Sequence, residues 1–253
     1  MDALKLGKFE FKSRFILGSG KYSLNLIKAA INEGEVDLLT LALRRANTGN
    51  VENILDYIPK GISLLPNTSG ARTAEEALKI ARLAREICKS ELVKIEVIRD
   101  SKYLLPDNYE TIKAVELLVK DGFTALPYMS ADLYAARAMR DAGAAAIMPL
   151  AAPIGTNKGL CAKEFIQILL NEIELPIIVD AGIGTPAQAC EAMQMGVSAV
   201  MANTAIALSN DVAKMSRAFK LAIQAGRNAY LAKIAPINEF ADASSPLTGF
   251  LRD

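Results

Sequence analysis

Residues 176–189 read PIIVDAGIGTPAQA, and this stretch contains the signals of a complete strand–turn–helix junction. An apolar, β-branched run ends at Asp180 and is followed by a Gly-x-Gly turn, Gly182 to Gly184. Thr185 is a favourable N-cap residue, and Pro186 suits the first position of a helix. A buried strand that passes directly into a helix is the repeating unit of a parallel sheet covered by helices.

The same pattern recurs from one end of the chain to the other. Short β-rich blocks alternate with amphipathic stretches, and the starts of the blocks are separated by roughly 20–30 residues, enough for a strand, a helix and two short loops. The predicted strands are residues 14–17, 36–43, 62–65, 92–98, 124–128, 145–150, 176–181 and 199–203. Eight such units can close into a barrel of about 250 residues, whereas a doubly wound sheet usually stops at about five or six strands. The sequence therefore predicts an α/β fold, a (β/α)8 TIM barrel, as a single domain over residues 1–253.

Segments outside the eight strands complete the expected fold. Residues 4–12 alternate apolar and polar side chains and predict a short N-terminal strand pair at the barrel floor. Residues 73–89, TAEEALKIARLAREICK, form the clearest helix pattern, with Thr73 as its N-cap. From about residue 235 to 253 the chain loses periodicity, which predicts a C-terminal arm. Further helices are expected to begin near Tyr109, Asp132, Ala162, Pro186 and Asp211.

Composition excludes several classes of function. The net charge is +1 with both signs interspersed, so no basic stripe is available to bind nucleic acid. The apolar residues occur in short blocks, none of which reaches the ~18–20 residues of a membrane span. The N-terminus lacks the features of a secretory signal, which predicts a cytoplasmic protein. Histidine is absent, which excludes histidine-based triads and metal sites, and the three cysteines form no C-x-x-C pair.

The fourth predicted strand, LVKIEVI at residues 92–98, carries two charged side chains. A period of two places Lys94 and Glu96 on one face and three β-branched apolar residues on the other. Because the apolar face suits packing beneath helices, Lys94 and Glu96 should point into the barrel. Burial disfavours an ammonium ion, so we expect a lowered pKa and an uncharged amine that can form an imine with a carbonyl compound. The alternative is a structural Lys–Glu ion pair, which the strand alone does not exclude.

The loops after the seventh and eighth strands favour a phosphate site. Glycines allow the backbone to approach an anion, and the start of a helix offers unpaired N–H groups. Asp180 should face the same mouth as Lys94 and Glu96 and so provide a third group for proton transfer, although a role in capping the next turn is the alternative. The residues expected to contact the phosphate are Ala181, Gly182, Ile183, Gly184, Asn203 and Thr204.

Other strand ends are weaker candidates for lining the same mouth. The glycines among them are explained equally well by a need for positive φ, and a solvated loop explains the arginine pair equally well. These candidates are Gly18-Ser19-Gly20-Lys21, Arg44-Arg45, Asn67-Thr68, Tyr128 to Ser130 and Pro153-Ile154-Gly155.

Motifs in a fixed order cover nearly the whole chain, from Phe15 to about Tyr230. They are GSGKY, LLPNTSGARTAEEA, VKIEVI, LLPD followed by Glu110, GFTALPY, IMPLAAPIG, IVDAGIGTPAQA, ANTAIA and QAGRNAY. In this order they resemble the thiazole synthases of bacterial and plastid thiamin biosynthesis.

The resemblance implies an enzyme that joins 1-deoxy-D-xylulose 5-phosphate, dehydroglycine and sulfur into a thiazole phosphate. The sulfur would arrive as a C-terminal thiocarboxylate on a small ubiquitin-like carrier protein, and a separate enzyme would supply the dehydroglycine. The resemblance also implies a homo-oligomer, commonly a tetramer, with no metal or redox cofactor. It places the imine-forming lysine at Lys94, the acid–base carboxylates at Glu96 and Asp180, and the sugar-phosphate contacts at Gly155, Ala181-Gly182 and Asn203-Thr204.

Two motifs depart from the family pattern. The sixth loop reads PIGTNKGL where PIGSGxG is usual, and GSGK replaces the commoner GTGK. Two other readings of the chain stay open. One is a Schiff-base-forming barrel lyase, either an aldolase or the barrel subunit of pyridoxal phosphate synthase, and the other is a barrel that serves only as a docking scaffold for a carrier.

Overall fold

The structure, a computed structural model, describes residues 2–18, 23–42 and 57–241. The predicted mouth residues Ser19-Gly20-Lys21 and Arg44-Arg45 lie outside the described residues.

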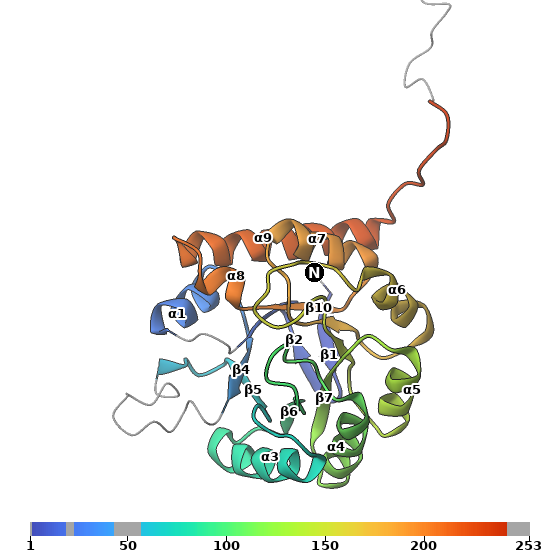
Figure 1. Cartoon of the computed structure of the whole chain (residues 1–253). Coiled ribbons are helices and arrows are strands. Elements are labelled where there is room, and N and C mark those ends of the chain that lie inside the picture. Colours follow the sequence, from blue (N-terminus) through green and yellow to red (C-terminus); the bar gives the residue numbers. More distant parts are fainter. Residues whose placement is uncertain (1, 19–22, 43–56, 242–253) are drawn as a thin grey trace, which may run out of the picture.

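The described residues form a ring of eight parallel strands surrounded by helices (Figure 1). The strand order is β8-β7-β6-β5-β4-β3-β10-β9, and isolated bridges at Ile147–Ile177 and Leu150–Asp180 connect β8 to β9 and close the ring. This confirms the predicted (β/α)8 barrel. The strands are β3 (Phe15–Leu17), β4 (Leu38–Ala42), β5 (Ser63–Asn67), β6 (Leu92–Ile95), β7 (Thr124–Met129), β8 (Met148–Pro149), β9 (Ile178–Val179) and β10 (Ala199–Ala202).

The strands overlap the predicted blocks but differ at their ends. β8 and β9 are short because their flanking residues pair only through isolated bridges. β5 extends past the predicted end at residue 65 to Asn67, with Pro66 paired opposite Leu41. A proline followed by an asparagine predicts a loop, since proline cannot donate to a sheet ladder.

The helices cover the outside of the ring. α3 (Ala74–Cys88) begins where the sequence predicts, with the Thr73 hydroxyl accepting a hydrogen bond from the Glu76 amide. α1 (Leu24–Asn32) follows a strand for which the sequence analysis named no helix start, and the short α8 (Thr204–Ala207) lies between β10 and the helix predicted to begin near Asp211. The other helices are α4 (Asn108–Lys120), α5 (Leu133–Asp141), α6 (Lys163–Glu172), α7 (Pro186–Met195) and α9 (Val212–Ala232).

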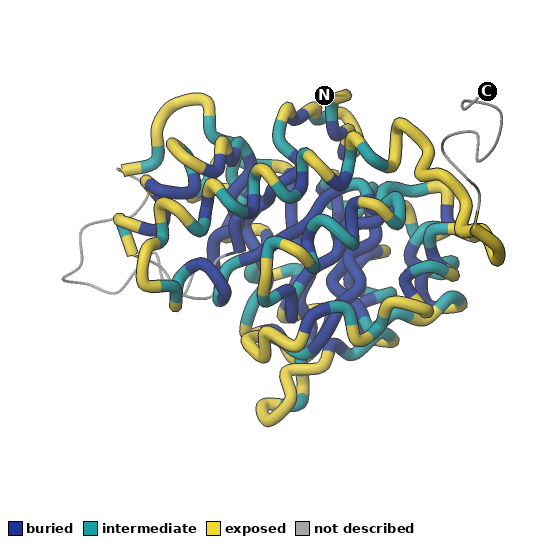
Figure 2. The backbone as a smooth tube through the Cα atoms, turned by 90° about the horizontal axis from the view of Figure 1, so that it is seen from above, coloured by how far each residue is buried: buried dark blue, intermediate teal, exposed yellow. Residues whose placement is uncertain are grey.

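Two separate apolar clusters follow from the alternation of side chains along the strands. Val93, Ile95 and Val97 belong to the outer cluster, which packs between the strands and the helices. Leu92 and Leu126 belong to the inner cluster, which fills the barrel. Figure 2 shows buried backbone in the middle of the molecule, surrounded by segments that are partly exposed.

A strand pair seals the barrel floor, as predicted. β1 (Leu4–Leu6) and β2 (Phe9–Phe11) are antiparallel, and Leu4, Leu6 and Phe11 belong to the inner cluster. The turn between them passes under the barrel, since a Cβ atom on Gly7 would lie 2.9 Å from the Thr124 side chain at the start of β7.

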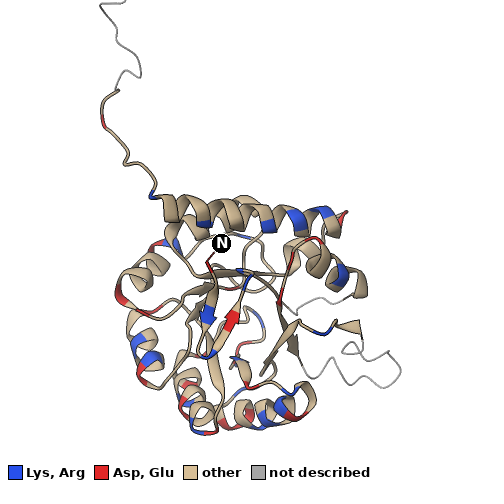
Figure 3. Ribbon diagram, turned by 180° about the vertical axis from the view of Figure 1, so that it is seen from behind, with Lys and Arg blue, Asp and Glu red and all other residues tan. Residues whose placement is uncertain are grey.

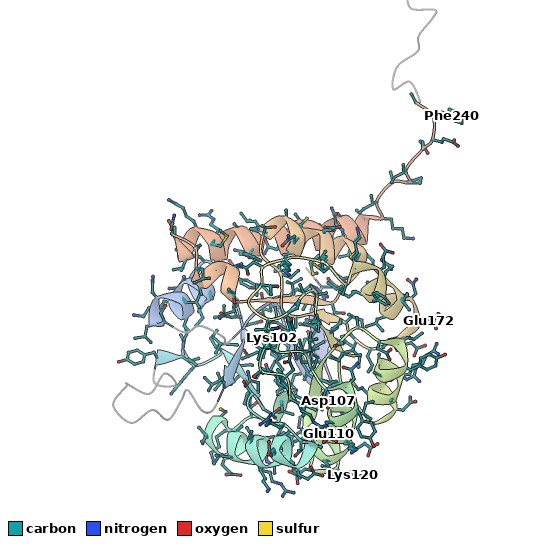
Figure 4. The ribbon with its side chains drawn as sticks, viewed as in Figure 1. Lys102, Asp107, Glu110, Lys120, Glu172 and Phe240 are labelled. Atoms are coloured by element: carbon teal, nitrogen blue, oxygen red, sulfur yellow. The ribbon has the colours of Figure 1, made fainter. Side chains whose placement is uncertain are left out.

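Beyond α9 the chain leaves the barrel as an exposed tail. Residues 233–241 contain no helix or strand, and Phe240 lies far from the barrel in Figure 4. Residues 242–253 lie outside the described residues, so the arm over residues 235–253 and the single domain over residues 1–253 stay predictions.

We expect Leu126→Ala to lower the free energy of unfolding by about 2–5 kcal/mol, because it leaves a cavity in the inner cluster. Leu83→Ala is the control, since Leu83 is 58% exposed on α3 and its truncation should cost about 0.5 kcal/mol or less. Urea denaturation of both variants measures the difference, and equal midpoints would contradict the inner cluster.

Candidate active site

Lys94, Glu96 and Asp180 meet inside the barrel at the carboxyl ends of β6 and β9. The Lys94 Nζ atom lies 2.9 Å from Glu96 Oε1 and 2.6 Å from Asp180 Oδ2. All three side chains are less than one-tenth exposed. Lys94 and Glu96 share a face because they are two residues apart, and Asp180 joins them because β9 ends at the same mouth. The predicted convergence of these three groups is therefore present in the structure.

The three groups line a cavity of about 290 Å³ at this mouth. Such a volume lies near the lower end of the range of small-molecule sites, about 300–1,000 Å³. Of the residues predicted to bind phosphate, the cavity is lined by Gly155, Ala181, Gly182, Ile183, Asn203 and Thr204. Gly184 does not line it.

The loop after β9 needs glycine at position 182. Its φ is +80°, and a Cβ atom would lie 2.5 Å from the backbone nitrogen of Ala152. The Gly182 carbonyl also accepts a 2.7 Å hydrogen bond from the Gly159 amide, which joins the sixth and seventh loops. The backbone around Gly182 is therefore held at the cavity wall by direct contact with the neighbouring loop.

The start of α7 is arranged differently from the expectation. The side-chain oxygen of Gln188 accepts hydrogen bonds from the amides of Gly184, at 2.9 Å, and Thr185, at 3.1 Å. Thr185 and Gln188 form a capping box, so these two amides are already satisfied within the helix start. The signal was present in the sequence, because a glutamine three residues after a threonine N-cap is the pattern of that motif. The amides left to face an anion belong to the earlier part of the loop.

The expected lowered pKa of Lys94, which would have given a neutral amine at rest, is wrong. Burial opposes the ammonium form, but the attraction of Asp180 and then of Glu96 outweighs it, so the pKa of Lys94 is raised above its ordinary value. Burial raises the pKa of Asp180, with Glu96 acting in the same direction and Lys94 against it. A sequence shows that a lysine is buried, but the sign of its pKa shift depends on which carboxylates lie beside it. The resting site holds an ammonium ion between two acceptors.

The weaker candidates fall into two groups. Gly18, Asn67, Ile154 and Gly155 line the cavity. Thr68, Tyr128, Ser130 and Pro153 do not. The Thr68 hydroxyl instead bonds both the carbonyl oxygen and the amide of Glu96, at 2.9 and 2.8 Å, and so holds the backbone at the end of β6.

The sequence analysis missed other residues of the cavity. Met201 on β10 places its sulfur 3.7 Å from Lys94 Nζ. Ile98 and Leu104 line the cavity from the loop after β6, where Lys102 lies over the centre of the barrel in the view of Figure 4. Asn157 lines it from the unusual sixth loop, with φ of +53°. Loop conformation places Ile98, Leu104 and Asn157 at the cavity, and a sequence does not reveal it. Met201 could have been found, because side chains alternate between the two faces of a strand and its position in β10 faces the barrel.

The outside of the barrel carries both signs of charge. Figure 3 shows Lys and Arg interspersed with Asp and Glu over the outer helices. None of the described helices combines the length and the hydropathy needed to cross a membrane.

We expect Lys94→Met to destabilise the protein more at about pH 8 than at about pH 5. Without the ammonium ion, the pKa of Asp180 should rise further above its unfolded value, which lies near 3.9. The folded state then retains a proton that the unfolded chain releases, so stability falls as the pH rises through that interval. Thermal unfolding at the two pH values measures the effect. The exposed Lys102→Met is the control, and a difference from wild type that did not change with pH would contradict the burial of the two carboxylates beside Lys94.

Comparisons with known proteins show the family of the chain. The chain matches the family described as "Thiazole biosynthesis protein ThiG" over residues 5–246. It is 78% identical to the thiazole synthase of Campylobacter jejuni strain RM1221, over 100% of this chain and 97% of that protein, and 70% identical to that of Fusobacterium nucleatum, over 99% and 98%. Among solved structures, the Amycolatopsis orientalis BexX/CysO complex matches with a TM-score of 0.83 and 32% identity, over 94% of this chain and 98% of that one. The chain therefore belongs to the thiazole synthase family of thiamin-biosynthesis enzymes.

Proposed function

We propose that this thiazole synthase binds 1-deoxy-D-xylulose 5-phosphate as an imine on Lys94 and combines it with dehydroglycine and sulfur from a thiocarboxylated carrier protein. The observation that carries the proposal is the position of Lys94, with its nitrogen at hydrogen-bonding distance from two buried carboxylates in a cavity that opens to solvent. This arrangement provides a nucleophile together with groups that can accept and return protons.

The first step is loss of a proton from the Lys94 ammonium. Asp180 is the acceptor, because its carboxylate is 2.6 Å away and burial raises its pKa. The neutral amine attacks the ketone carbon, and the carbonyl oxygen leaves as water after it has taken up two protons. Two carboxylates beside one amine would let the enzyme keep Lys94 protonated at rest and remove its proton when the substrate binds.

The next step isomerises the imine to an aminoketone. One carboxylate removes a proton from the neighbouring carbon, and a proton returns elsewhere on the conjugated system. Glu96 and Asp180 are suited to this exchange because they reach the same nitrogen from β6 and from the end of β9. The carbonyl exposed in this way would accept the sulfur of the thiocarboxylate, and loss of water with closure onto dehydroglycine would form the ring.

The phosphate would bind at the loops after β9 and β10. Gly182 and Ile183 line the cavity with their backbone, and Asn203 and Thr204 approach from the neighbouring strand end. The Asn203 side-chain amide donates to the Gly18 carbonyl, which fixes the eighth loop against the first. Gly155 lines the same cavity from the sixth loop. Convergent backbone amides at this end of a barrel commonly bind phosphate.

The partners of the reaction follow from the same proposal. The sulfur carrier would dock at the barrel mouth, and the existence of a complex between BexX and a second protein, CysO, supports docking on this fold. A separate enzyme would supply dehydroglycine. We further propose that the protein works in the cytoplasm as a homo-oligomer, most simply a tetramer, with the chain as one domain and no metal or redox cofactor of its own.

Lys94→Ala should abolish the borohydride-trapped adduct with 1-deoxy-D-xylulose 5-phosphate, because the only proposed imine-forming amine is removed. Mass spectrometry of the trapped protein locates the adduct. Lys214→Ala on α9 is the control, since the Lys214 side chain is 88% exposed and should leave the adduct at wild-type levels. A wild-type protein that forms no adduct on Lys94 would contradict the proposal and favour a docking scaffold. An adduct without any thiazole product after addition of thiocarboxylated carrier and dehydroglycine would favour a lyase.

Asp180→Asn should retain an adduct, because Glu96 still lies 2.9 Å from the Lys94 nitrogen and can accept its proton. It should slow the conversion of the adduct by about 100-fold or more, since general acid–base groups typically contribute about 10²–10⁴ in rate. The amide keeps the shape of the side chain and cannot accept the proton. Rapid mixing with borohydride quenching follows formation and decay of the adduct separately. Normal turnover in this variant would remove Asp180 from the proton transfers.

A further inference from the structure

Tyr128 lies on the same inward face of β7 as Leu126, two residues further toward the carboxyl end of the strand. It is the largest of the fully buried side chains, with an exposed fraction of 0%. Its ring lies 5.3 Å, measured to the centroid, from the Nζ atom of Lys94. Tyr128 is on β7, where its backbone pairs with Met148 of β8. It does not line the cavity, so it can influence the reaction only through the groups that do.

The Tyr128 hydroxyl is buried and has no hydrogen-bond partner among the described residues. Such a group costs stability, because its bonds to water are lost and not replaced. A phenylalanine would fill the same space without that cost. The presence of tyrosine in the resting protein therefore indicates that the hydroxyl acquires a partner at another stage.

The surroundings of the hydroxyl identify that partner. The Lys94 nitrogen that lies 5.3 Å from the centroid of the Tyr128 ring also lies 2.9 Å from Glu96 Oε1 and 2.6 Å from Asp180 Oδ2, so both carboxylates belong to the same buried group of side chains. Burial raises the pKa of Tyr128, and Asp180, followed by Glu96, raises it further. The hydroxyl therefore stays protonated beside two carboxylates, and Asp180 acts on it more strongly. A protonated phenol close to a carboxylate can only serve it as a hydrogen-bond donor.

Formation of the imine changes what the carboxylates can bind, a point that rests on the proposed function. In the resting site the ammonium of Lys94 lies within reach of both Glu96 and Asp180. When the amine condenses with a ketone, one C=N bond forms, the carbonyl oxygen departs as water, and the nitrogen keeps one proton or none. It can then donate to one carboxylate at most. The other would be left buried and ionised without a donor, which raises its pKa further and lowers the fraction that is ionised and able to accept a proton at neutral pH.

We propose that Tyr128 is a positioning residue whose hydroxyl donates a hydrogen bond to Asp180 once Lys94 has become an imine. The bond keeps Asp180 ionised and oriented toward the carbon from which it removes a proton. In the resting enzyme the ammonium ion contacts Asp180 Oδ2, and no hydrogen bond joins the Tyr128 hydroxyl to that carboxylate.

The test compares Tyr128→Phe with wild type in two measurements. Borohydride trapping with 1-deoxy-D-xylulose 5-phosphate reports the imine on Lys94, and exchange of substrate C–H protons into deuterated solvent reports the later proton transfer. We expect Tyr128→Phe to form the adduct to the wild-type extent and to exchange about 10-fold or more slowly at neutral pH, as for a lost bond to a charged group. The acid limb of the exchange profile should move to higher pH, because Asp180 without its donor takes up a proton more readily.

The control is Thr111→Val on α4, which removes another buried hydroxyl that has no partner among the described residues and that lies outside the cavity. Both variants should unfold at or above the wild-type temperature, and Thr111→Val should keep the wild-type exchange rate and pH profile. Unchanged exchange and an unchanged profile in Tyr128→Phe would overturn the proposal. So would loss of folded protein in that variant, since it would show that the hydroxyl has a partner at rest. A wild-type protein without any adduct would instead reject the proposed function.

Discussion

The alternation of side chains between the two faces of a strand is the constraint on which this structure depends. On β6 it sends Val93 and Ile95 to the helices and Leu92 and Lys94 into the barrel. The inner column thus changes from apolar to charged within two residues. Apolar layers below and solvent above leave the charged side chains at the boundary between a low-dielectric interior and an open mouth. A shift of one residue in register would send Lys94 to the helices and end the chemistry.

That boundary explains how lysine can be both buried and charged. Moving a cation out of water costs free energy. The attraction of a single buried carboxylate often only offsets that cost. Here two carboxylates contact the same nitrogen, so the ammonium form wins and the pKa rises. Burial raises the pKa of Asp180, and the charge of Glu96 acts in the same direction against the attraction of Lys94. Lys94, Glu96 and Asp180 form the resting ion cluster. In the proposed reaction, transfer of one proton from Lys94 to Asp180 would convert the same cluster into its reactive form.

Much of this could be predicted from the sequence. Strand parity gave the inward direction of Lys94 and Glu96, and the repeated strand–helix pattern indicated the barrel, because both depend on local periodicity. The charge of Lys94 could not be predicted, since it depends on a distance to Asp180, which is 86 positions away along the chain. Gly184 was assigned to phosphate, although the side-chain oxygen of Gln188 accepts the hydrogen bond of its amide. Tyr128 was expected at the mouth but does not line the cavity, because the packing of the side chains around it, which the sequence does not give, buries it completely.

The strand pair at the floor also bears on the order of events. β1 and β2 place Leu4, Leu6 and Phe11 across the end of the barrel opposite the mouth, where all three are buried. In the proposed reaction the sugar phosphate would reach Lys94 from the mouth, and the water of condensation would leave on the same side. A protein-borne sulfur donor inserted first would block that path. The closed floor therefore favours an ordered reaction, in which the sugar phosphate binds before the carrier protein.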